Sequence, residues 1–223
     1  MNDQEFDIYE LDNNLHDLGY KYVCGVDEAG RGPLAGPCVV CACILPEFER
    51  IEGINDSKQL TKKKREELYK IIVKKAIAYK VIYVKEKEID QKNIYQATKD
   101  GMIKAINSLK VKPDYVITDA MPIKDLGIHV EDIIHGDAKS ASVAAASIIA
   151  KVVRDNYMDK MDIKYPNYGF SHNKGYCTKM HMDALEEYGP TPIHRKTYYP
   201  VSKYFSGMTQ LSIFDDVEEK SEE

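Results

Sequence analysis

The chain has 223 residues, of which 43% are hydrophobic and 30% are charged. This balance is ordinary for a globular protein, and the length allows one sizeable core with a small appendage, so a fibrous or disordered chain is excluded. No apolar stretch is long enough to cross a bilayer, and the acidic residues 1–10 do not resemble a signal peptide. We therefore expect a cytoplasmic protein.

The net charge of −5 argues at first against a nucleic-acid partner. The negative charge, however, is concentrated at the two ends: residues 1–19 carry −6 and residues 215–223 carry −5, which leaves +6 on residues 20–214. Exposed charges more than about 10 Å apart are screened at cellular salt, so a basic body can attract a polyanion despite acidic ends. The charge pattern permits nucleic-acid binding without requiring it.

Five cysteines are present, and three of them lie in one apolar run. If that run is a strand, Cys41 and Cys43 face one side of the sheet and Cys38 faces the other, which is a poor arrangement for one metal cage. We expect buried free thiols in a reducing compartment. A zinc site that also uses Cys24 stays open as the alternative.

The predicted elements follow in chain order. Residues 20–26 and 37–45 are strands separated by a glycine-rich turn. A helix begins at residues 55–57 and its apolar face holds Leu68, Ile71, Ile72, Ala76 and Tyr79. A strand at 81–84, a helix at 94–109, strands at 115–118 and 130–134, and helices at 139–161 and 178–188 complete the body.

This order, strands first and then alternating helices and strands, predicts an α/β fold. We expect a mixed five-stranded sheet flanked by helices, with a C-terminal helical segment. The long helix at 139–161 is rich in Ala and Ser near its start. Small residues there would let it lie very close to the sheet.

Carboxylates stand at the ends of the predicted strands. Asp27 and Glu28 follow the first strand, Asp119 closes the strand at 115–118, and Asp137 precedes the long helix. Taken singly, such acids are most often turn residues or helix caps, but together they could converge at one edge of the sheet. Four carboxylates that meet cannot all stay ionised without cations, and oxygen ligands suit Mg²⁺ or Mn²⁺. Such a site indicates phosphodiester hydrolysis.

The glycine-rich turn at residues 30–36 has two interpretations. It misses the dinucleotide-binding pattern because Ala35 stands where the third glycine belongs, and it lacks the Gly-Lys-Ser/Thr of a P-loop. One interpretation is a plain hairpin turn. The other is a ligand site, in which bare backbone admits a sugar or phosphate and Arg31 supplies a fixed positive charge.

Six segments together resemble the bacterial ribonuclease HII family. In order, they are GVDEAGRGPLAGP at 25–37, DSKQL at 56–60, TDA at 118–120, GDAKS at 136–140, KGYCT at 174–178 and HR at 194–195. The resemblance spans residues 20–200. It implies a ribonuclease H-like fold and an enzyme that hydrolyses the RNA strand of RNA–DNA hybrids, and cuts 5′ of ribonucleotides embedded in DNA, by a two-metal-ion mechanism.

The resemblance also implies roles for particular residues. The acidic metal-binding cluster would be Asp27, Glu28, Asp119 and Asp137, with Mg²⁺ or Mn²⁺ as cofactor. The segment that senses the 2′-hydroxyl, the one group that separates RNA from DNA, would be Gly30, Arg31 and Gly32. Tyr176 would pack against the sugar on the deoxy side of the junction, although any one of 16 tyrosines is more often a surface or core aromatic.

Other residues carry weaker expectations. Ser57 and Lys58 are expected to touch the phosphate backbone, although Ser57 could equally cap the following helix. Histidines in the body are expected to be structural, because a metal-activated water needs no histidine base. The Gly30–Gly32 segment and the short N-terminus favour type 2 over type 3, since type 3 enzymes lack that segment and carry an extra N-terminal domain.

Two other functions stay open. One is a different nuclease on a ribonuclease H-like fold, such as a junction resolvase, which the Gly30–Gly32 segment and Tyr176 disfavour. The other is a non-catalytic hybrid-binding protein, which the complete acidic set disfavours. We expect a monomer with no membrane partner.

The chain divides into an acidic N-terminal extension at 1–19, a catalytic domain at 20–205 and a flexible acidic tail at 206–223. Within the tail, Gln210, Leu211 and Phe214 stand in an otherwise polar, acidic segment. This cluster resembles the short peptide by which bacterial replication proteins bind the sliding clamp. The alternative is a terminal segment that folds back onto the body.

Overall fold

A mixed sheet of five strands forms the centre of the protein, in a computed structural model that describes residues 7–124 and 126–206. The strands are β1 (Val23–Ala29), β2 (Cys38–Ile44), β3 (Ala78–Val84), β4 (Tyr115–Asp119) and β5 (His129–Ile133). Their order in the sheet is β3-β2-β1-β4-β5. The pairs β1–β2 and β2–β3 are antiparallel, whereas β1–β4 and β4–β5 are parallel. The predicted α/β fold with a mixed five-stranded sheet is confirmed.

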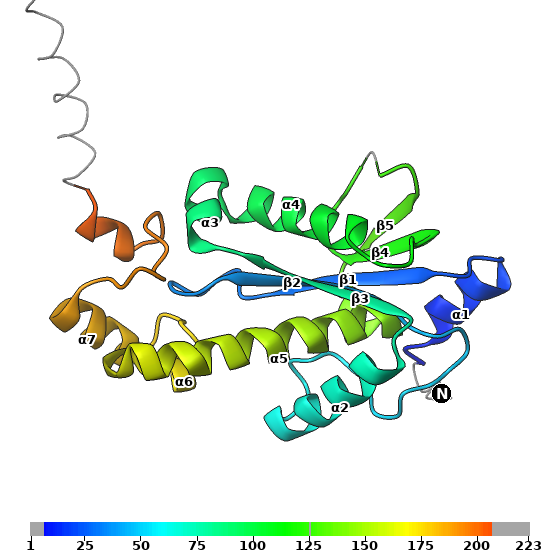
Figure 1. Cartoon of the computed structure of the whole chain (residues 1–223), viewed down its shortest axis with the longest axis horizontal. Helices are drawn as coiled ribbons and strands as arrows, with labels where there is room; N and C mark the ends of the chain where they lie inside the picture. The colour runs from blue at the N-terminus through cyan, green and yellow to red at the C-terminus, as the bar shows by residue number, and fades with distance from the viewer. Residues whose placement is uncertain (1–6, 125, 207–223) are drawn as a thin grey trace, which may run out of the picture.

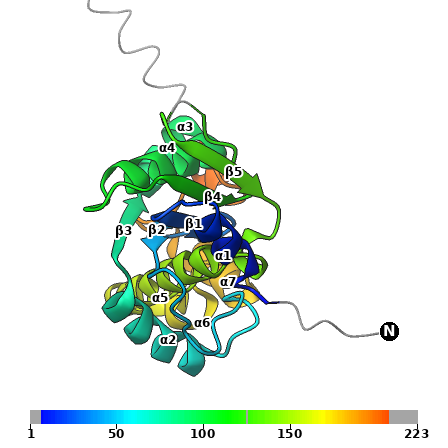
Figure 2. The ribbon, with the colours of Figure 1, turned by 90° about the vertical axis from the view of Figure 1, so that its right-hand side faces the viewer.

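Helices cover both faces of the sheet (Figures 1 and 2). One face carries α3 (Glu86–Lys92) and α4 (Ile94–Asn107), and the other carries α2 (Lys62–Lys75) and the long α5 (Ala141–Lys164). Past one end of the sheet lie α6 (Phe170–Asn173), α7 (Lys179–Tyr188) and the 3₁₀ turn η3 (Val201–Tyr204), which form the C-terminal helical segment (Figure 1).

Strand β2 shows how the two faces are filled. All seven of its residues are buried, and alternate side chains enter opposite clusters: Cys41 and Cys43 pack on the α5 side, and Cys38 packs on the α4 side. Burial raises the pKa of Cys24 and of Cys38 to about 12, so both remain neutral thiols. The prediction of buried free thiols is confirmed for these four cysteines, and Cys177 is exposed.

Helix α5 lies very close to β1, as its small residues predicted. A Cβ atom on Gly25 would come within 2.0 Å of the Ser142 carbonyl carbon, so only glycine permits this approach. The residues from Ala141 to Ala150 of α5 are all buried. The helix begins after Ser140, whose hydroxyl accepts a hydrogen bond from the Val143 amide at 3.3 Å.

The first predicted helix has the wrong bounds. Residues 55–57 do not start it. They form a separate turn, in which the Asp56 carboxylate accepts a hydrogen bond from the Lys58 amide at 2.8 Å. The N-cap of α2 is Thr61. The helix ends at Lys75, and Tyr79 already belongs to β3, where its side chain is 42% exposed. Ile71 is also exposed, whereas Leu68 and Ile72 are buried as predicted.

Three of the α-helices in the described ranges were not predicted, and one of them is the four-residue α6. Helix α1 (Glu10–Asp17) lies in the acidic N-terminal stretch, yet it packs on the body: Leu15 joins a buried cluster with Val23 and Val143. The buried Asp12 carboxylate accepts from the Ala141 and Ser142 amides, both at 3.1 Å, at the start of α5. A carboxylate at this position stabilises α5, because the N-terminal end of a helix carries partial positive charge.

Helix α3 has only seven residues, too few for a periodic pattern. None of the helices in the described ranges is long and apolar enough to span a membrane.

Candidate active site

Three carboxylates converge where β1 and β4 end. The parallel register pairs Val26 with Thr118, so Asp27 and Asp119 come next in their strands and project from the same face. Asp137 joins them from the 3₁₀ turn η1 (Gly136–Ala138) that precedes α5. One ligand oxygen from each of the three lies within 4.8 Å of the others. The prediction that Asp27 follows the first strand is wrong, because β1 continues to Ala29, whereas Asp119 closes β4 as predicted. The predicted convergence of these three acids is seen in the structure.

Glu28 stands apart from this group because adjacent residues of a strand face opposite sides. Asp27 faces α5, whereas Glu28 faces the other way, and its Oε1 accepts from Arg31 Nη1 at 3.4 Å. The other oxygen, Oε2, is buried and has no hydrogen-bond partner among the described residues. Glu28 therefore borders the three-carboxylate group with an unsatisfied ligand atom.

The site resists the ionisation of its own acids. Burial raises the pKa of Asp27 well above its usual range, and the charges of Glu28 and Asp119 raise it further. Burial likewise raises the pKa of Glu28 to about 6, against the lowering effect of Arg31. Burial and the charge of Asp119 raise the pKa of Asp137, although Lys58 opposes the shift. These shifts show that negative charge is crowded in a poorly solvated place.

This arrangement fits hard divalent cations. All the donors are carboxylate oxygens, which suit Mg²⁺ or Mn²⁺ rather than zinc. A cation between Asp27, Asp119 and Asp137 would offset the repulsion that contributes to the raised pKa values of Asp27 and Asp137. Among the described residues, no other group of His, Cys, Asp or Glu has the spacing of a metal site.

Lys58 reaches the acids and Ser57 does not. Lys58 Nζ lies 3.2 Å from Asp137 Oδ2, while three quarters of its side chain is exposed. Ser57 is only 3% exposed, and its hydroxyl pairs with that of Ser147 on α5 at 2.8 Å. The side chain of Ser57 is thus used inside the protein and is not free to contact a phosphate. The alternative role for Ser57 as the cap of α2 is also wrong, because Thr61 has that role.

The glycine-rich turn lies against Tyr176. A Cβ atom built on Gly32 would lie 3.7 Å from Cε1 of Tyr176, whose side chain is 45% exposed. Gly30 has a φ of +98°, and a Cβ there would meet the Arg154 side chain at 1.9 Å. Gly30 thus requires glycine for both backbone and space. The three predicted recognition elements, the turn, Arg31 and Tyr176, form one surface.

Two buried arginines hold this surface, and sequence reasoning assigned them no role. Arg154 of α5 donates to the carbonyls of Pro37, Ala35 and Lys174, which ties the turn to the loop before Tyr176. Arg195 donates to the carbonyls of Gly30, Arg31 and Gly36. Both arginines are about 1% exposed or less. Arg195 stands in the HR segment at 194–195 that contributed to the family resemblance, but no pattern in the sequence marks an arginine as buried, and Arg154 lies in none of the six segments.

A pair of histidines also supports Tyr176. His181 Nδ1 lies 2.9 Å from the Tyr176 carbonyl, and His181 Nε2 lies 2.9 Å from His194 Nε2. His194 Nδ1 lies 2.9 Å from the Thr191 amide nitrogen. Both rings are buried away from the acids.

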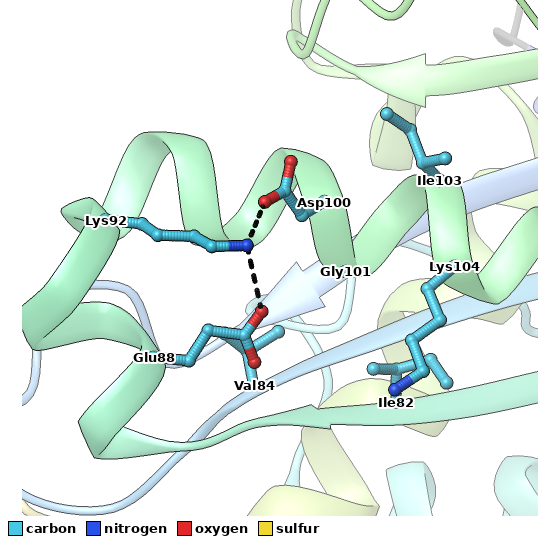
Figure 3. Close-up of a pocket in the computed structure, with 8 residues that line it drawn as sticks. All are labelled: Ile82, Val84, Glu88, Lys92, Asp100, Gly101, Ile103 and Lys104. Carbon is cyan, nitrogen blue, oxygen red and sulfur yellow. Dashed lines mark hydrogen bonds and ion pairs between the residues drawn. The ribbon is translucent and has the colours of Figure 1, made fainter.

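A pocket of about 390 Å³ lies on the other face of the sheet, between β3, α3 and α4 (Figure 3). Its Lys92 is held by Asp100 at 2.7 Å and Glu88 at 3.9 Å. No residue of the acidic group lines this pocket. Three of its charged residues, Lys92, Glu88 and Asp100, are paired with each other, and the pocket does not form part of the candidate active site.

Solved structures with similar folds define the class. Ribonuclease H2 from Pyrococcus horikoshii matches with a TM-score of 0.71 and 32% identity, over 82% of this chain and 96% of that one. Ribonuclease HII in a PCNA complex from Archaeoglobus fulgidus matches with a TM-score of 0.69 and 28% identity, over 79% and 95% of the two chains. Bst-RNase HIII in complex with Mn²⁺, 18% identical with a TM-score of 0.63, shares the fold over 85% of this chain and 71% of that one. The protein has a ribonuclease H-like fold.

Sequence comparison names the family. A family model described as Ribonuclease HII matches residues 24–201. Ribonuclease HII of Acholeplasma laidlawii is 52% identical over 197 residues, which are 88% of this chain and 96% of that protein. Ribonuclease HII of Shouchella clausii is 49% identical over 201 residues, 90% of this chain and 77% of that protein. This chain belongs to the ribonuclease HII family, as its motifs predicted.

Proposed function

We propose that this protein hydrolyses the RNA strand of RNA–DNA hybrids and cuts duplex DNA on the 5′ side of embedded ribonucleotides. The observation that carries the proposal is the position of the three-carboxylate group, which stands at the end of the same strand that leads into the glycine-rich turn beside Tyr176. One surface therefore combines a site for cations with a site for a sugar. Family membership supports ribonuclease H chemistry and disfavours a junction resolvase.

In this proposal, Asp27, Asp119 and Asp137 hold divalent cations, Mg²⁺ or Mn²⁺, and Glu28 completes the set for a pair. Such cations supply an activated water and stabilise the charge that develops on the phosphate oxygens. Hydrogen bonds inside the protein keep the acids in position: Asp119 Oδ1 accepts from the Gly136 amide at 2.9 Å, and Asp27 Oδ1 accepts from the Glu28 amide at 2.7 Å. Lys58 attracts the substrate's phosphates to the rim of the site.

Substrate selection falls to the other half of the surface. The backbone of residues 30–32 contacts the 2′-hydroxyl of the ribonucleotide, because glycines leave no side chain between the backbone and the ribose. Tyr176 offers its exposed ring to the adjacent deoxyribose. All these residues come from one chain, which supports action as a monomer, and the substrate supports a cytoplasmic location.

The decisive experiment uses a DNA duplex with one ribonucleotide, an all-DNA duplex of the same sequence, and a mapped cut site. We expect cleavage only with Mg²⁺ or Mn²⁺ and only at the ribonucleotide, with a 3′-hydroxyl and a 5′-phosphate as the new ends. These ends follow because water, not the 2′-hydroxyl, attacks phosphorus. Ends with a 2′,3′-cyclic phosphate would contradict the mechanism, and metal-independent binding without any cleavage would favour the non-catalytic alternative.

We also propose that the C-terminal tail binds the replication sliding clamp. The structural relative from Archaeoglobus fulgidus was solved as a PCNA complex. Gln210, Leu211 and Phe214, on which this proposal rests, lie outside the described residues, so its support is the sequence of the tail and that relative. Delivery by the clamp would bring the enzyme to newly copied DNA.

A further inference from the structure

Arg195 is a buried charge whose only hydrogen-bond partners are backbone groups. Its side chain is 0% exposed, and among the ion pairs of the described residues none includes it. Burying an unpaired charge is costly, so a guanidinium is kept in such a place only where its fixed geometry is used. The geometry here is directed at one target, the glycine-rich turn.

Arg195 draws three carbonyls of that turn inward. Its Nη2 donates to the Gly30 carbonyl at 2.6 Å, its Nη1 donates to the Arg31 carbonyl at 2.6 Å, and its Nε donates to the Gly36 carbonyl at 3.1 Å. The Arg195 backbone adds a further tie, because its amide donates to the Leu34 carbonyl at 2.8 Å. The planar fork thus fixes the orientation of successive peptide groups in the turn.

Fixed carbonyls also fix the amides opposite them. In a trans peptide the C=O and the following N–H point in opposite directions, and the only cis bond in the described ranges is Tyr199–Pro200. The carbonyls of Gly30 and Arg31 point towards Arg195, so the amides of Arg31 and Gly32 point away from it. Both residues are exposed, and among the hydrogen bonds of the described residues neither amide donates. Two adjacent donors therefore face outward beside the Tyr176 ring.

We propose that Arg195 is a positioning residue that sets the ribonucleotide specificity of the enzyme. By turning the Gly30 and Arg31 carbonyls inward, it presents the Arg31 and Gly32 amides to the 2′-oxygen of the substrate. A deoxyribose leaves both donors without a partner in a desolvated contact, and a site of this kind rejects the substrate that lacks the hydroxyl. The inference rests on the proposed function and adds the residue that orients the donors.

Tyr198 offers a milder form of the same contact. Its hydroxyl donates to the Arg31 carbonyl at 2.8 Å, and its ring lies 5.0 Å from the Arg195 guanidinium carbon. Removing this hydroxyl would loosen one of the two peptide groups while the ring still packs against Arg195. The pair therefore gives a graded series, with Tyr198→Phe as the mild change and Arg195→Lys as the severe one. Lysine keeps the charge but loses the planar fork.

The test measures a ratio, so that loss of stability alone cannot imitate the effect. Binding to a duplex with one ribonucleotide and to the matching all-DNA duplex is measured without divalent cations, and cleavage is measured with Mg²⁺. We expect Arg195→Lys to lower kcat/KM at the ribonucleotide by about 100-fold, the scale of a lost pre-oriented donor. The ratio of its Kd for the all-DNA duplex to its Kd for the ribonucleotide duplex should fall towards one. The Kd for the all-DNA duplex itself should change less than about threefold, because the phosphate contacts persist. Tyr198→Phe should lower kcat/KM and the binding preference in the same direction, with a fold-change about a tenth as large.

Two further arms keep the test decisive. Ile72→Ala removes a buried side chain of α2 far from the turn, so it should cost stability and leave the binding preference unchanged. In the wild-type protein, the amide resonances of Arg31 and Gly32 should shift with the ribonucleotide duplex and not with the all-DNA duplex. This measurement needs no variant, so it and Tyr198→Phe decide the matter if Arg195→Lys does not fold.

Unchanged preference in Arg195→Lys and Tyr198→Phe, or amide resonances that respond equally to both duplexes, would overturn the role of Arg195. If the wild-type enzyme itself fails to distinguish the two duplexes, the proposed function fails first. If the wild-type enzyme prefers the ribonucleotide duplex and both variants keep that preference, the role of Arg195 is wrong while the proposed function stands.

Discussion

The acidic residues of the site show a conflict between charge and solvation. Asp27 and Asp137 are 4% and 2% exposed, yet the site needs them as anions when cations bind. In the metal-free protein, burial and the neighbouring carboxylates raise the pKa values of Asp27, Glu28 and Asp137, so each resists ionisation. This crowding is the consequence of placing one oxygen from each of Asp27, Asp119 and Asp137 within 4.8 Å of the others.

Replacing Asp119 by Asn removes the negative charge of this side chain but keeps its size. We expect turnover to fall by at least about 1,000-fold at saturating Mg²⁺, because a ligand for the cations loses its charge. The free energy of unfolding of the metal-free protein should stay equal or rise, since repulsion with Asp27 falls and the Asn oxygen can still accept from the Gly136 amide. Steady-state kinetics and urea denaturation measure the two effects.

Asp132→Asn is the matched control for that change. Asp132 lies beside Thr118 in the neighbouring strand β5 and is exposed, so the substitution removes the same charge close to the site without removing a member of the group. Its rate should stay within about twofold of the wild type, since exposed charges contribute little. Near-normal turnover in Asp119→Asn would show that the acidic group is not the metal site.

Sequence reasoning reached some residues and not others for a physical reason. Acids at the ends of parallel strands meet at one edge of a sheet, so Asp27 and Asp119 could be placed from strand order alone. Glu28 could not be separated from them without the alternation of β1. Arg195 is found only from the burial of its side chain, which depends on contacts with residues more than 150 positions away.

At the level of elements, α5 positions the whole site. Its successive turns contact successive parts of β1 and the glycine-rich turn: Ser142 meets Gly25, Ser147 meets Asp27, Arg154 meets Gly30, and Met158 meets Gly36. A single rigid helix therefore fixes the distance from the acidic group to the recognition surface. The sequence predicted the close approach of this helix because small residues leave room for it.

The pair of buried histidines, His181 of α7 and His194, has one consistent proton arrangement. The Tyr176 carbonyl can only accept, so His181 Nδ1 donates to it and His181 Nε2 accepts from His194. His194 Nδ1 then accepts from the Thr191 amide. Each ring carries one proton, and a second proton on either ring would set two N–H groups against each other or against the amide.

This arrangement predicts a pH effect on stability. Burial and the neighbouring His181 lower the pKa of His194 from 6.5 to about 4. Between these values the unfolded chain binds a proton that the folded protein does not, so the stability is complete above pH 6.5 and falls as the pH drops towards 4. His194→Gln should shrink that loss by on the order of 2 kcal/mol, as measured by urea denaturation at each pH.

His172→Gln serves as the control, because His172 is exposed on α6 and takes no part in the arrangement. Its dependence of stability on pH should match the wild type. The interpretation would be wrong if His194→Gln kept the full wild-type loss between pH 6.5 and 4.

Element boundaries were predictable only where local chemistry decides them. The caps at Ser140 and Thr178 fixed the starts of α5 and α7 to within about two residues of the prediction. The start of α2 was missed because Asn55-Asp56-Ser57 looks like a cap but forms a turn of its own. Helix α1 was missed because its acidic sequence reads as a solvated tail, whereas Asp12 and Leu15 are anchored by distant partners.

At the scale of the whole molecule, charge is divided between a basic body, which we propose binds nucleic acid, and two acidic ends. The last nine residues carry −5, and the body carries +6. An acidic tail is a poor ligand for DNA, so under the proposed function it would be available to a protein partner while the body binds the substrate. The proposed clamp peptide lies immediately before that acidic stretch.

The last prediction concerns this tail and is independent of the catalytic assignment. Leu211 and Phe214 are large apolar residues in a polar segment, and we expect them to fill apolar pockets on the clamp while Gln210 makes polar contacts. A segment that orders on binding, with few anchors, should bind at around micromolar Kd. Clamp from the same organism is tested by calorimetry against the full chain, a chain that ends at Met208, and the double variant Leu211→Ala/Phe214→Ala.

We expect binding by the full chain and by a Ser212→Ala control, whose change leaves both apolar anchors in place. Binding should be lost, by at least about tenfold in Kd, in the shortened chain and in the double variant, because each anchor contributes more than 1 kcal/mol to a small interface. All four proteins should cut a short free duplex at the same rate, since that substrate needs no clamp. Clamp binding that survives both the truncation and the double substitution would place the contact on the body instead of the tail.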